Sequence, residues 1–224
     1  MTEPFSQPTW VQFLASPDEA GLQALTLGQG GRLSHYQIQD IIPVRGSTPV
    51  DLGADWTMLR LETAMPITRF EEGWAPSTSS IIPFQGVTTH LQYTSHSQRQ
   101  ELDRRSAGEL EPSEQTIAVL IPIGKTAAWW ALAQDQRQAQ FQSTRTEKGH
   151  TVIGLAYADR VFRKLYHSRY LKAGLSYDFL TYFEFQERDT EAFKALLTEL
   201  RDPRDNPEWA YVDFEFEIWM TKLG

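Results

Sequence analysis

A histidine and an arginine stand thirteen positions apart in this 224-residue sequence, and their side chains could do chemistry together. His150 could offer an imidazole nitrogen to a metal ion, because histidine is the commonest metal ligand in proteins. Arg163 carries a permanent positive charge, and its forked N–H donors suit an oxyanion. Structural roles are also open. His150 could cap or pack a helix, and Arg163 could belong with Lys164 and Arg169 to a basic helix end that complements the helix dipole.

The segment that joins these two residues is predicted to be a helix over residues 151–167. An ideal straight helix rises about 20 Å over thirteen residues and turns the last side chain away from the first. The helix must therefore bend or end near Arg163 if both side chains are to reach one site. The helical prediction rests on apolar residues at helical spacing, namely Val152, Ile153, Leu155, Val161, Phe162 and Leu165.

The composition is that of an ordinary globular protein. The sequence has 41% hydrophobic and 12% aromatic residues, which is enough to build a core at this length. Its formal net charge of −8 disfavours nucleic acid as a partner, since phosphates require clustered Lys and Arg. The opening residues lack the charged and apolar regions of a secretory signal, and no run of about eighteen apolar residues could cross a membrane. We therefore expect a cytoplasmic protein with no nucleic-acid or membrane partner.

The absence of cysteine from the sequence limits its metal chemistry. Disulfides, zinc–thiolate sites, cysteine-held iron–sulfur clusters and covalent attachment through a C-x-x-C-H motif are all excluded. No Ser-His-Asp ordering, histidine pair at i, i+4 or phosphate-binding glycine loop rises above chance. Any metal-bearing cofactor must therefore be held without a covalent bond, through a nitrogen ligand.

The order of the predicted elements is typical of an α+β fold. Alternating or wholly apolar segments between Pro- and Ser-rich turns predict strands, and Thr126 is a plausible N-cap for the first helix. The predicted strands cover residues 35–44, 56–63, 86–94, 116–123, 178–186 and 210–221, and the predicted helices cover 126–142, 151–167 and 190–200.

A series of linked motifs occupies the second half of the sequence. It comprises Pro122 with Lys125, the pair Trp129-Trp130, His150, the run Arg163-Lys164-Leu165-Tyr166-His167-Ser168 and the run Phe179-Leu180-Thr181-Tyr182-Phe183-Glu184. Two further motifs follow, Glu191-Ala192-Phe193 and Glu208-Trp209-Ala210-Tyr211-Val212. In this order the motifs resemble the chlorite dismutase family, and the resemblance extends from about Gly86 to the end of the chain.

The resemblance implies a particular α+β architecture. Two ferredoxin-like halves form a barrel-like antiparallel core of the dimeric α+β barrel superfamily, with haem in the C-terminal half. We expect the N-terminal half at residues 31–115 and the haem-binding half at 116–224. Residues 1–30 are expected to be an extension or oligomer arm. The weak first half is more similar to the short lineage of the family, so a homodimer is expected, with a homopentamer as the alternative.

The resemblance also implies a cofactor, haem b, bound without a covalent link. His150 is then the axial ligand of the iron, and Glu208 accepts the N–H of its far nitrogen. Arg163 is the distal catalytic residue. The expected activity is decomposition of chlorite to chloride and dioxygen, through a ferryl intermediate and a retained hypochlorite. Without the resemblance, Glu208 would be interpreted as a solvated charge before the last strand.

Four more residues are implied to belong to the haem site. Lys125 and Tyr93 look placed to bind its propionates, as a cation and as a hydroxyl donor. Of Trp129 and Trp130, one would pack near the proximal face and the other toward a subunit contact. The alternatives are a surface lysine and a plain aromatic core. His35, His90, His96 and His167 are assigned no role.

Two alternative functions remain open. A coproheme decarboxylase shares the fold and axial histidine but lacks the distal arginine, and it uses a tyrosine at the position of Ile121. A phenol is absent there, so Ile121 and Arg163 together favour chlorite chemistry. The other alternative is a haem-binding or stress-response protein without turnover.

Overall fold

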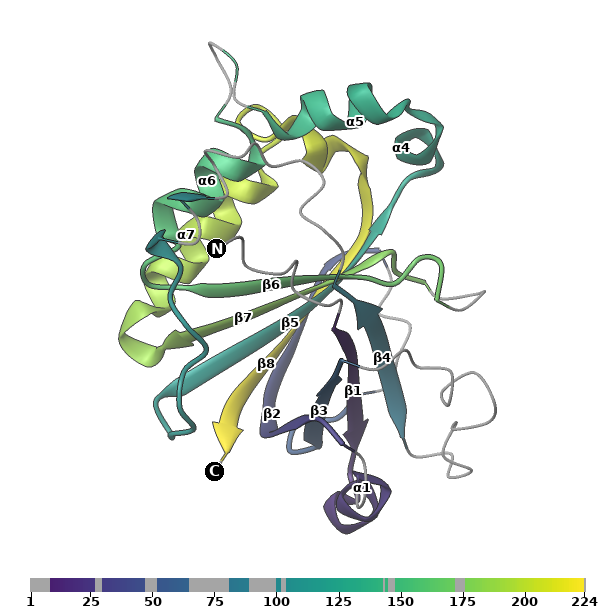
Figure 1. The fold of residues 1–224 in the computed structure, drawn as a ribbon, viewed down its shortest axis with the longest axis vertical. Helices are drawn as coiled ribbons and strands as arrows, with labels where there is room; N and C mark the ends of the chain where they lie inside the picture. The colour runs from purple at the N-terminus through teal and green to yellow at the C-terminus, as the bar shows by residue number, and fades with distance from the viewer. Residues whose placement is uncertain are drawn as a thin grey trace, which may run out of the picture.

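The computed structural model describes residues 9–26, 30–46, 52–64, 81–88, 100–101, 104–142, 144, 148–171 and 176–223. Within these residues, strands close into an antiparallel barrel in the order β1-β3-β2-β8-β5-β7-β6-β4, and most helices lie beside the C-terminal strands (Figure 1). The strands are β1 (Trp10–Ser16), β2 (Arg32–Arg45), β3 (Thr57–Thr63), β4 (Ile82–Val87), β5 (Thr116–Lys125), β6 (Phe162–His167), β7 (Phe179–Gln186) and β8 (Val212–Leu223). The helices are α1 (Glu19–Thr26), α4 (Ala127–Ala131), α5 (Gln134–Phe141), α6 (Gly149–Tyr157) and α7 (Thr190–Arg201), with 3-10 turns η1 (Glu187–Asp189) and η2 (Pro207–Tyr211).

The two halves of the barrel have the same strand order. The N-terminal sheet runs β4-β1-β3-β2 and the C-terminal sheet runs β8-β5-β7-β6, so each places its fourth strand beside its first. This is the ferredoxin-like arrangement. Strands β2 and β8 join the halves along one seam, from His35 opposite Leu223 to Arg45 opposite Glu215. Strands β4 and β6 meet on the other side, where Val87 faces His167. The predicted fold class is confirmed.

Each face of the C-terminal sheet packs against its own apolar core, because successive side chains along a strand point to opposite faces. The inner face fills the barrel with aromatic rings such as Phe13, Tyr182 and Phe216. The outer face packs against α6 and α7, and Phe183 and Phe185 belong to this second core. Helix α7 completes it through residues at helical spacing, Phe193, Leu196, Leu197 and Leu200.

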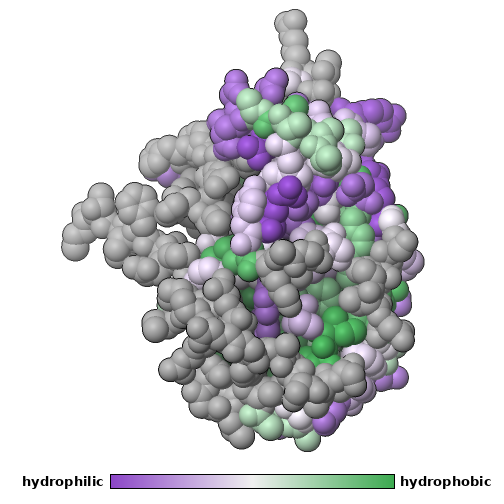
Figure 2. Space-filling view, turned by 90° about the vertical axis from the view of Figure 1, so that its right-hand side faces the viewer, coloured by the Kyte–Doolittle hydropathy of each residue, from purple (hydrophilic) through white to green (hydrophobic). Residues whose placement is uncertain are grey.

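The surface also differs between the ends of the molecule. Figure 2 shows mostly hydrophilic residues over the upper, helical end of one face and a group of apolar residues lower down. Helix α5 at this upper end buries none of its residues. No described helix is long and apolar enough to cross a membrane.

The expectation that residues 1–30 form an extension differs from the structure. Strand β1 is an integral barrel strand, paired with β3 from Trp10 opposite Thr63 to Ser16 opposite Thr57. It pairs with β4 on its other edge. Because Val11 and Phe13 are 0% exposed, their burial fixes this segment in the N-terminal sheet. Residues 10–16 therefore belong to the first half of the barrel.

The predicted helix over residues 151–167 is wrong in its second part. Helix α6 ends at Tyr157, and β6 begins at Phe162 and pairs with β7 along its length. Residues 162–167 combine apolar spacing that a helix could use with an alternation that a strand uses, and the ladder to β7 decides between them. Arg163 is thereby placed on a strand that lies opposite the helix carrying His150.

The remaining boundaries differ in smaller ways. The predicted helix over 126–142 is two helices, α4 and α5, separated by extended backbone at Leu132 and Ala133. The N-cap prediction is confirmed, because the Thr126 hydroxyl accepts from the Trp129 N–H at 3.3 Å. The predicted strand over 86–94 begins earlier, since β4 covers Ile82–Val87, and its residues 89–94 lie outside the described residues.

Candidate functional site

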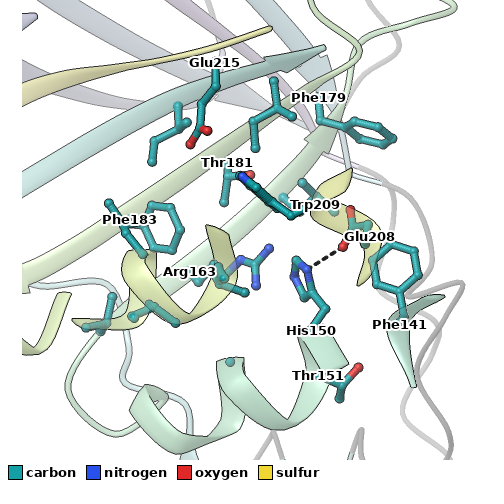
Figure 3. Close-up of a pocket in the computed structure, with 18 of the residues that line it drawn as sticks. Phe141, His150, Thr151, Arg163, Phe179, Thr181, Phe183, Glu208, Trp209 and Glu215 are labelled. Carbon is teal, nitrogen blue, oxygen red and sulfur yellow. Dashed lines mark hydrogen bonds and ion pairs between the residues drawn. The ribbon is translucent and has the colours of Figure 1, made fainter. Parts of the chain in front are cut away.

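A pocket with a cavity of about 250 Å³ lies between the outer face of the C-terminal sheet and the helices that cover it (Figure 3). Four neighbouring strands form its floor through alternate residues, which a strand directs to one face. The floor residues are Ile121, Ile123 and Lys125 of β5, Arg163, Leu165 and His167 of β6, Phe179, Thr181 and Phe183 of β7, and Glu215 of β8. The opposite wall includes His150, Thr151 and Gly154 of α6 and Leu196, Leu197 and Leu200 of α7.

A glycine with a left-handed backbone sets the position of His150. Gly149 has φ +71° and opens α6, and its N–H donates to the Asp205 carbonyl at 2.9 Å. A Cβ atom at this position would lie 2.7 Å from the Gln142 carbonyl carbon. A side chain is therefore excluded both by conformation and by space. This fixed helix start aims His150 into the pocket.

Lys125, Glu208 and His150 form a buried chain of hydrogen bonds, called here the charge chain, with His150 at its end. His150 Nδ1 lies 2.7 Å from Glu208 Oε2, and Glu208 Oε1 accepts from Lys125 Nζ at 2.5 Å. The side chains of Glu208 and Lys125 are 6% and 2% exposed. Burial alone would raise the pKa of Glu208, but the Lys125 ammonium and His150 outweigh it and hold that pKa well below its usual range. Glu208 is therefore ionised and fixes the proton of His150 on Nδ1.

The other nitrogen of His150 is left to face the pocket. Burial lowers the pKa of His150, and the positive charge of Arg163 lowers it further. The imidazole is consequently neutral near pH 7, with Nε2 as a lone-pair donor. A neutral imidazole whose N–H donates to a carboxylate is the usual state of a metal-binding histidine.

Arg163 faces His150 from β6, and the two side chains point toward one another in Figure 3. Its guanidinium has no carboxylate within salt-bridge distance in the described part of the chain. The guanidinium carbon lies 5.7 Å from the centre of the Phe183 ring. Burial lowers the pKa of Arg163 to about 10, against the attraction of Glu208. The group stays cationic at neutral pH, so its unshared donors can hold an anion.

These residues fit haem. In the described ranges no group of three or more His, Asp or Glu could hold a bare metal ion, and His150 is the imidazole that the helical wall of the pocket offers. Gly154 follows His150 by one helical turn, and a Cβ there would meet only Arg163 Nη1 at 3.6 Å. The missing side chain keeps this face of α6 flat beside the imidazole. A carboxylate-paired histidine on one wall, a flat helix face beside it and a largely apolar cavity suit an iron porphyrin.

The structure places Lys125 differently from its expected role at a propionate. Its ammonium is buried against Glu208 and lies 4.8 Å from the centre of the Trp129 ring. A buried lysine remains charged only beside a carboxylate, and here that partner is Glu208. Lys125 therefore belongs to the charge chain behind His150. Tyr93, the other expected propionate contact, lies outside the described residues.

The two tryptophans lie in different surroundings. Trp129 lines the pocket and is 1% exposed. Trp130 stacks on Phe179, with ring centroids 6.0 Å apart, and its Nε1 donates to Asp178 at 3.2 Å. The guanidinium carbon of Arg169 lies 3.9 Å from the centre of the Trp130 ring. Trp129 thus contributes to the pocket wall, while Trp130 supports the wall through Phe179.

Three polar residues of the pocket floor were not expected from the sequence. His167 is two strand positions beyond Leu165 and four beyond Arg163, so a strand prediction would have placed it on the same face. Thr181 occupies the equivalent face of β7. Glu215 lines the pocket from β8 and is 1% exposed. The sequence feature that could have pointed to Glu215 is the alternation of acidic and apolar residues in β8, a pattern that usually indicates a solvated face.

The fold and the pocket together define a class of protein, an α+β barrel of two ferredoxin-like halves with one histidine-bearing pocket outside the C-terminal sheet. A family model described as chlorite dismutase matches residues 58–216, which is most of the chain. The chain belongs to the chlorite dismutase family, and the resemblance noted in the sequence is confirmed.

Individual relatives agree with this assignment. The chain is 33% identical to a chlorite dismutase from Ideonella dechloratans over 122 residues, which are 54% of this chain and 39% of the relative's length. Among solved structures, a dimeric chlorite dismutase from Nitrobacter winogradskyi is 27% identical with a TM-score of 0.66, covering 94% of this chain and 99% of that one. A variant of the chlorite dismutase from Candidatus Nitrospira defluvii, 22% identical with a TM-score of 0.67, covers 99% of this chain and 93% of that one and shares the fold.

Proposed function

We propose that this protein is a haem b enzyme that converts chlorite to chloride and dioxygen. The observation that carries the proposal is the opposition of two groups across one pocket, a carboxylate-paired His150 and an arginine without a carboxylate partner among the described residues. The reaction balances without protons, since one ClO₂⁻ gives one Cl⁻ and one O₂. The pocket therefore has to hold an anion and an iron, and it needs no proton donor for the net reaction.

His150 would hold the iron through Nε2, because Nδ1 is committed to Glu208. Bound haem would supply the redox chemistry that breaks a chlorine–oxygen bond. Glu208 would orient the imidazole and make it a stronger electron donor by accepting its N–H. Lys125 would keep Glu208 ionised and in place, since the two groups lie 2.5 Å apart in a buried setting.

Arg163 would bind the anion. A guanidinium without a carboxylate partner in a largely apolar cavity attracts a monoanion strongly, because little water screens the charge. The same side chain would then retain the hypochlorite that leaves when the first bond breaks, so that the two oxygen atoms can recombine. Phe183 and Leu165, which line the same wall, would exclude water from this step.

Ile121 argues against the coproheme decarboxylase alternative. It lines the pocket and is 2% exposed, at the position where that reaction would need a tyrosine. An aliphatic side chain cannot donate an electron or a proton. Haem binding without turnover remains the other outcome that an experiment has to distinguish.

The test is a product analysis on protein reconstituted with haem b. After addition of chlorite, ion chromatography should find chloride as the chlorine product, with little free hypochlorite or chlorate. Arg163→Ala should release hypochlorite, because nothing then retains the anion. Unchanged chlorite in the presence of bound haem would contradict the proposed activity and favour the non-catalytic alternative.

A homodimer is the assembly we propose. The support is the chain's similarity to the dimeric chlorite dismutase from Nitrobacter winogradskyi, which the chain covers almost completely. Light scattering after size exclusion gives the molar mass directly. Twice the chain mass of 25.7 kDa supports the dimer, and five times that mass would establish the pentamer instead.

A further inference from the structure

A buried carboxyl group in the pocket has no part in the proposed reaction. Glu215 of β8 lies beside Ile123 of β5, and its side chain is 1% exposed. It lines the same cavity as Arg163 and Thr181, and Figure 3 shows its carboxyl group directed into that space. An acid in a site built for anions requires a physical explanation, since an ionised carboxylate there would oppose anion binding.

The two oxygens of Glu215 have different surroundings. Oε1 accepts from Arg201 Nε at 3.0 Å and from Arg201 Nη2 at 2.6 Å. Oε2 is buried and has no hydrogen-bond partner. A buried carboxylate oxygen without a donor is costly when it carries charge, and a proton on that oxygen removes the charge and leaves an O–H that could donate to a ligand in the pocket.

Neighbouring charges favour the same state. Arg201 is shared, because its Nη2 also lies 2.6 Å from Glu217 Oε1. Glu217 receives a second bond from Trp219 Nε1 at 2.6 Å, so both of its oxygens have donors. One guanidinium therefore faces two carboxyl groups, of which only Glu217 is fully hydrogen-bonded. Of the two acids, Glu215 is therefore the one on which the surroundings favour a proton.

The groups around Glu215 account for its titration. Burial raises the pKa of Glu215 and the charge of Glu217 raises it further, against the lowering effect of Arg201 on α7 and Arg45 on β2. Arg45 lies opposite Glu215 in the ladder between β2 and β8, and its Nη1 donates to the Val212 carbonyl at 2.6 Å. From β5 the residue paired with Glu215 is the uncharged Ile123.

We propose that Glu215 determines the specificity of the pocket for small monoanions: it is a neutral acid with its proton on Oε2 when the pocket binds an anion, and its ionisation excludes the anion. This inference rests on the proposed anion-binding role of Arg163. Protonated Glu215 leaves Arg163 as the net charge of the cavity floor and presents an O–H donor to a bound oxyanion. Ionised Glu215 adds a negative charge to the lining of the same low-dielectric cavity and repels the anion there.

Nitrite is a suitable probe, because it is a bent oxyanion with the same charge as chlorite. Optical titration of the haem-reconstituted protein gives its Kd from about pH 5 to about pH 8, a range in which Arg163 stays charged and which lies above the ordinary pKa of a glutamate. We expect wild-type affinity to fall about tenfold or more across this range. In Glu215→Gln, which keeps a neutral donor, the affinity should be almost independent of pH. In Glu217→Gln the fall in nitrite affinity should occur at lower pH than in wild type, since Arg201 is then paired with the carboxyl group of Glu215 alone.

Glu191→Gln is the matched control, because the Glu191 side chain is 85% exposed on α7, and its pH profile should equal that of wild type. The same pH profile in wild type and Glu215→Gln would overturn the proposal. Infrared difference spectra of wild type minus Glu215→Gln test it without haem. A protonated carboxyl band at about pH 5, where the wild type is expected to bind nitrite most tightly, supports it, and its absence there contradicts it. Failure of the enzymatic proposal is seen separately, as unchanged chlorite.

Discussion

Two cations in the pocket have opposite functions, and their partners explain why. Lys125 is neutralised by Glu208 at 2.5 Å, so its charge stabilises the carboxylate behind His150. Arg163 has no carboxylate partner in the described segments, so its charge is available to a ligand. Exchanging the two residue types would fail, because a buried ammonium loses its proton more readily than a guanidinium. At the residue scale, function therefore depends on which cation is paired.

Replacement of His150 tests the assignment of the metal ligand. His150→Ala should abolish the haem spectrum of the wild-type ligation state, because no other imidazole occupies this wall of the pocket in the described ranges. Absorption spectra after reconstitution provide the measurement. His35→Ala is the control, since His35 lies on β2 outside the pocket, and it should bind haem normally. An unaltered spectrum in His150→Ala would show that the iron is ligated elsewhere.

Replacement of Arg163 separates binding of haem from turnover. Arg163→Ala should retain haem and lose about 10²-fold in kcat/KM for chlorite, the usual effect of removing one strong donor from an anion site. The kcat/KM of Arg163→Lys should lie between those of wild type and Arg163→Ala, because lysine keeps the charge but lacks the forked donors. Steady-state oxygen release provides the comparison. Equal turnover in all three proteins would remove Arg163 from the reaction.

The charge chain also predicts a pH dependence of stability. The pKa of Glu208 is lower in the folded protein than in the unfolded chain, so its contribution is complete above about pH 4.5 and is lost progressively as the pH falls below that value. Glu208→Gln leaves Lys125 buried without a carboxylate and should cost about 3–5 kcal/mol at pH 7.

Urea unfolding of wild type and Glu208→Gln at pH 7 and near pH 4 measures both effects. The free-energy difference between the two proteins should shrink in acid, because wild type then loses the contribution that the variant already lacks. A difference that is the same at both pH values would mean that the Glu208 charge does not stabilise the fold.

At the scale of elements, the site depends on two changes of backbone conformation that lie close together in the chain. Helix α6 must start at Gly149 to aim His150, and the chain must change from helix to strand between Tyr157 and Phe162 to aim Arg163. The strand ladder from β6 to β7 then fixes which residues of β6 face the pocket. The pair His150 and Arg163 is thus set by a helix and a strand rather than by spacing along one helix.

Gly149→Ala tests the first of these changes. Alanine at φ +71° costs about 1–2 kcal/mol, and its Cβ would also lie 2.7 Å from the Gln142 carbonyl carbon. The helix start should shift and haem affinity should fall by about tenfold or more. Gly108→Ala is a control, because no atom lies within 4 Å of its added Cβ. Haem titration followed by absorbance would contradict this account if the two variants bound haem equally well.

Sequence alone predicted most elements but not the contacts that define the site. The motifs identified His150, Arg163 and Glu208, because they are recognisable without knowing the fold. Lys125 was misassigned because its partner Glu208 is 83 residues away, and no local pattern reports such a pair. Glu215 was missed because alternating acids normally face solvent, whereas here α7 covers that face and Arg201 reaches it.

The helix predicted over residues 151–167 failed for a related reason. Its apolar residues satisfy a helical period, and the alternation in residues 162–167 satisfies a strand equally well. Only pairing with β7, which follows later in the chain, selects the strand. Strand β1 was missed because its identity depends on β3 and β4, its partners in the sheet.

At the scale of the whole molecule, the two halves share a barrel interior that is partly polar. Arg60 is 1% exposed and donates to Glu62 at 2.6 Å, to Glu109 at 2.8 Å and to the Tyr166 hydroxyl at 2.9 Å. These bonds link β3 of the first half to β6 of the second. The pocket lies on the other face of β6, so the barrel interior supports the strand that carries Arg163.

Arg60→Leu tests how the halves are joined. Without the guanidinium, buried carboxylates are left with no cation beside them. We therefore expect the unfolding free energy to fall by about 3–5 kcal/mol. Haem ligation should be unchanged under conditions where the variant is folded, because Arg60 lies on the inner side of the barrel. Denaturant unfolding and absorption spectra provide the two readouts. Wild-type stability in Arg60→Leu would show that this network does not hold the halves together.

The most direct test of the account is the oxygen yield of the haem-reconstituted protein, measured with an oxygen electrode after addition of a known amount of chlorite. Close to one dioxygen per chlorite is expected, with release lost in His150→Ala and strongly reduced in Arg163→Ala. Haem bound by His150 with no oxygen released would leave the fold and the ligand assignment intact and would contradict the proposal that this pocket decomposes chlorite.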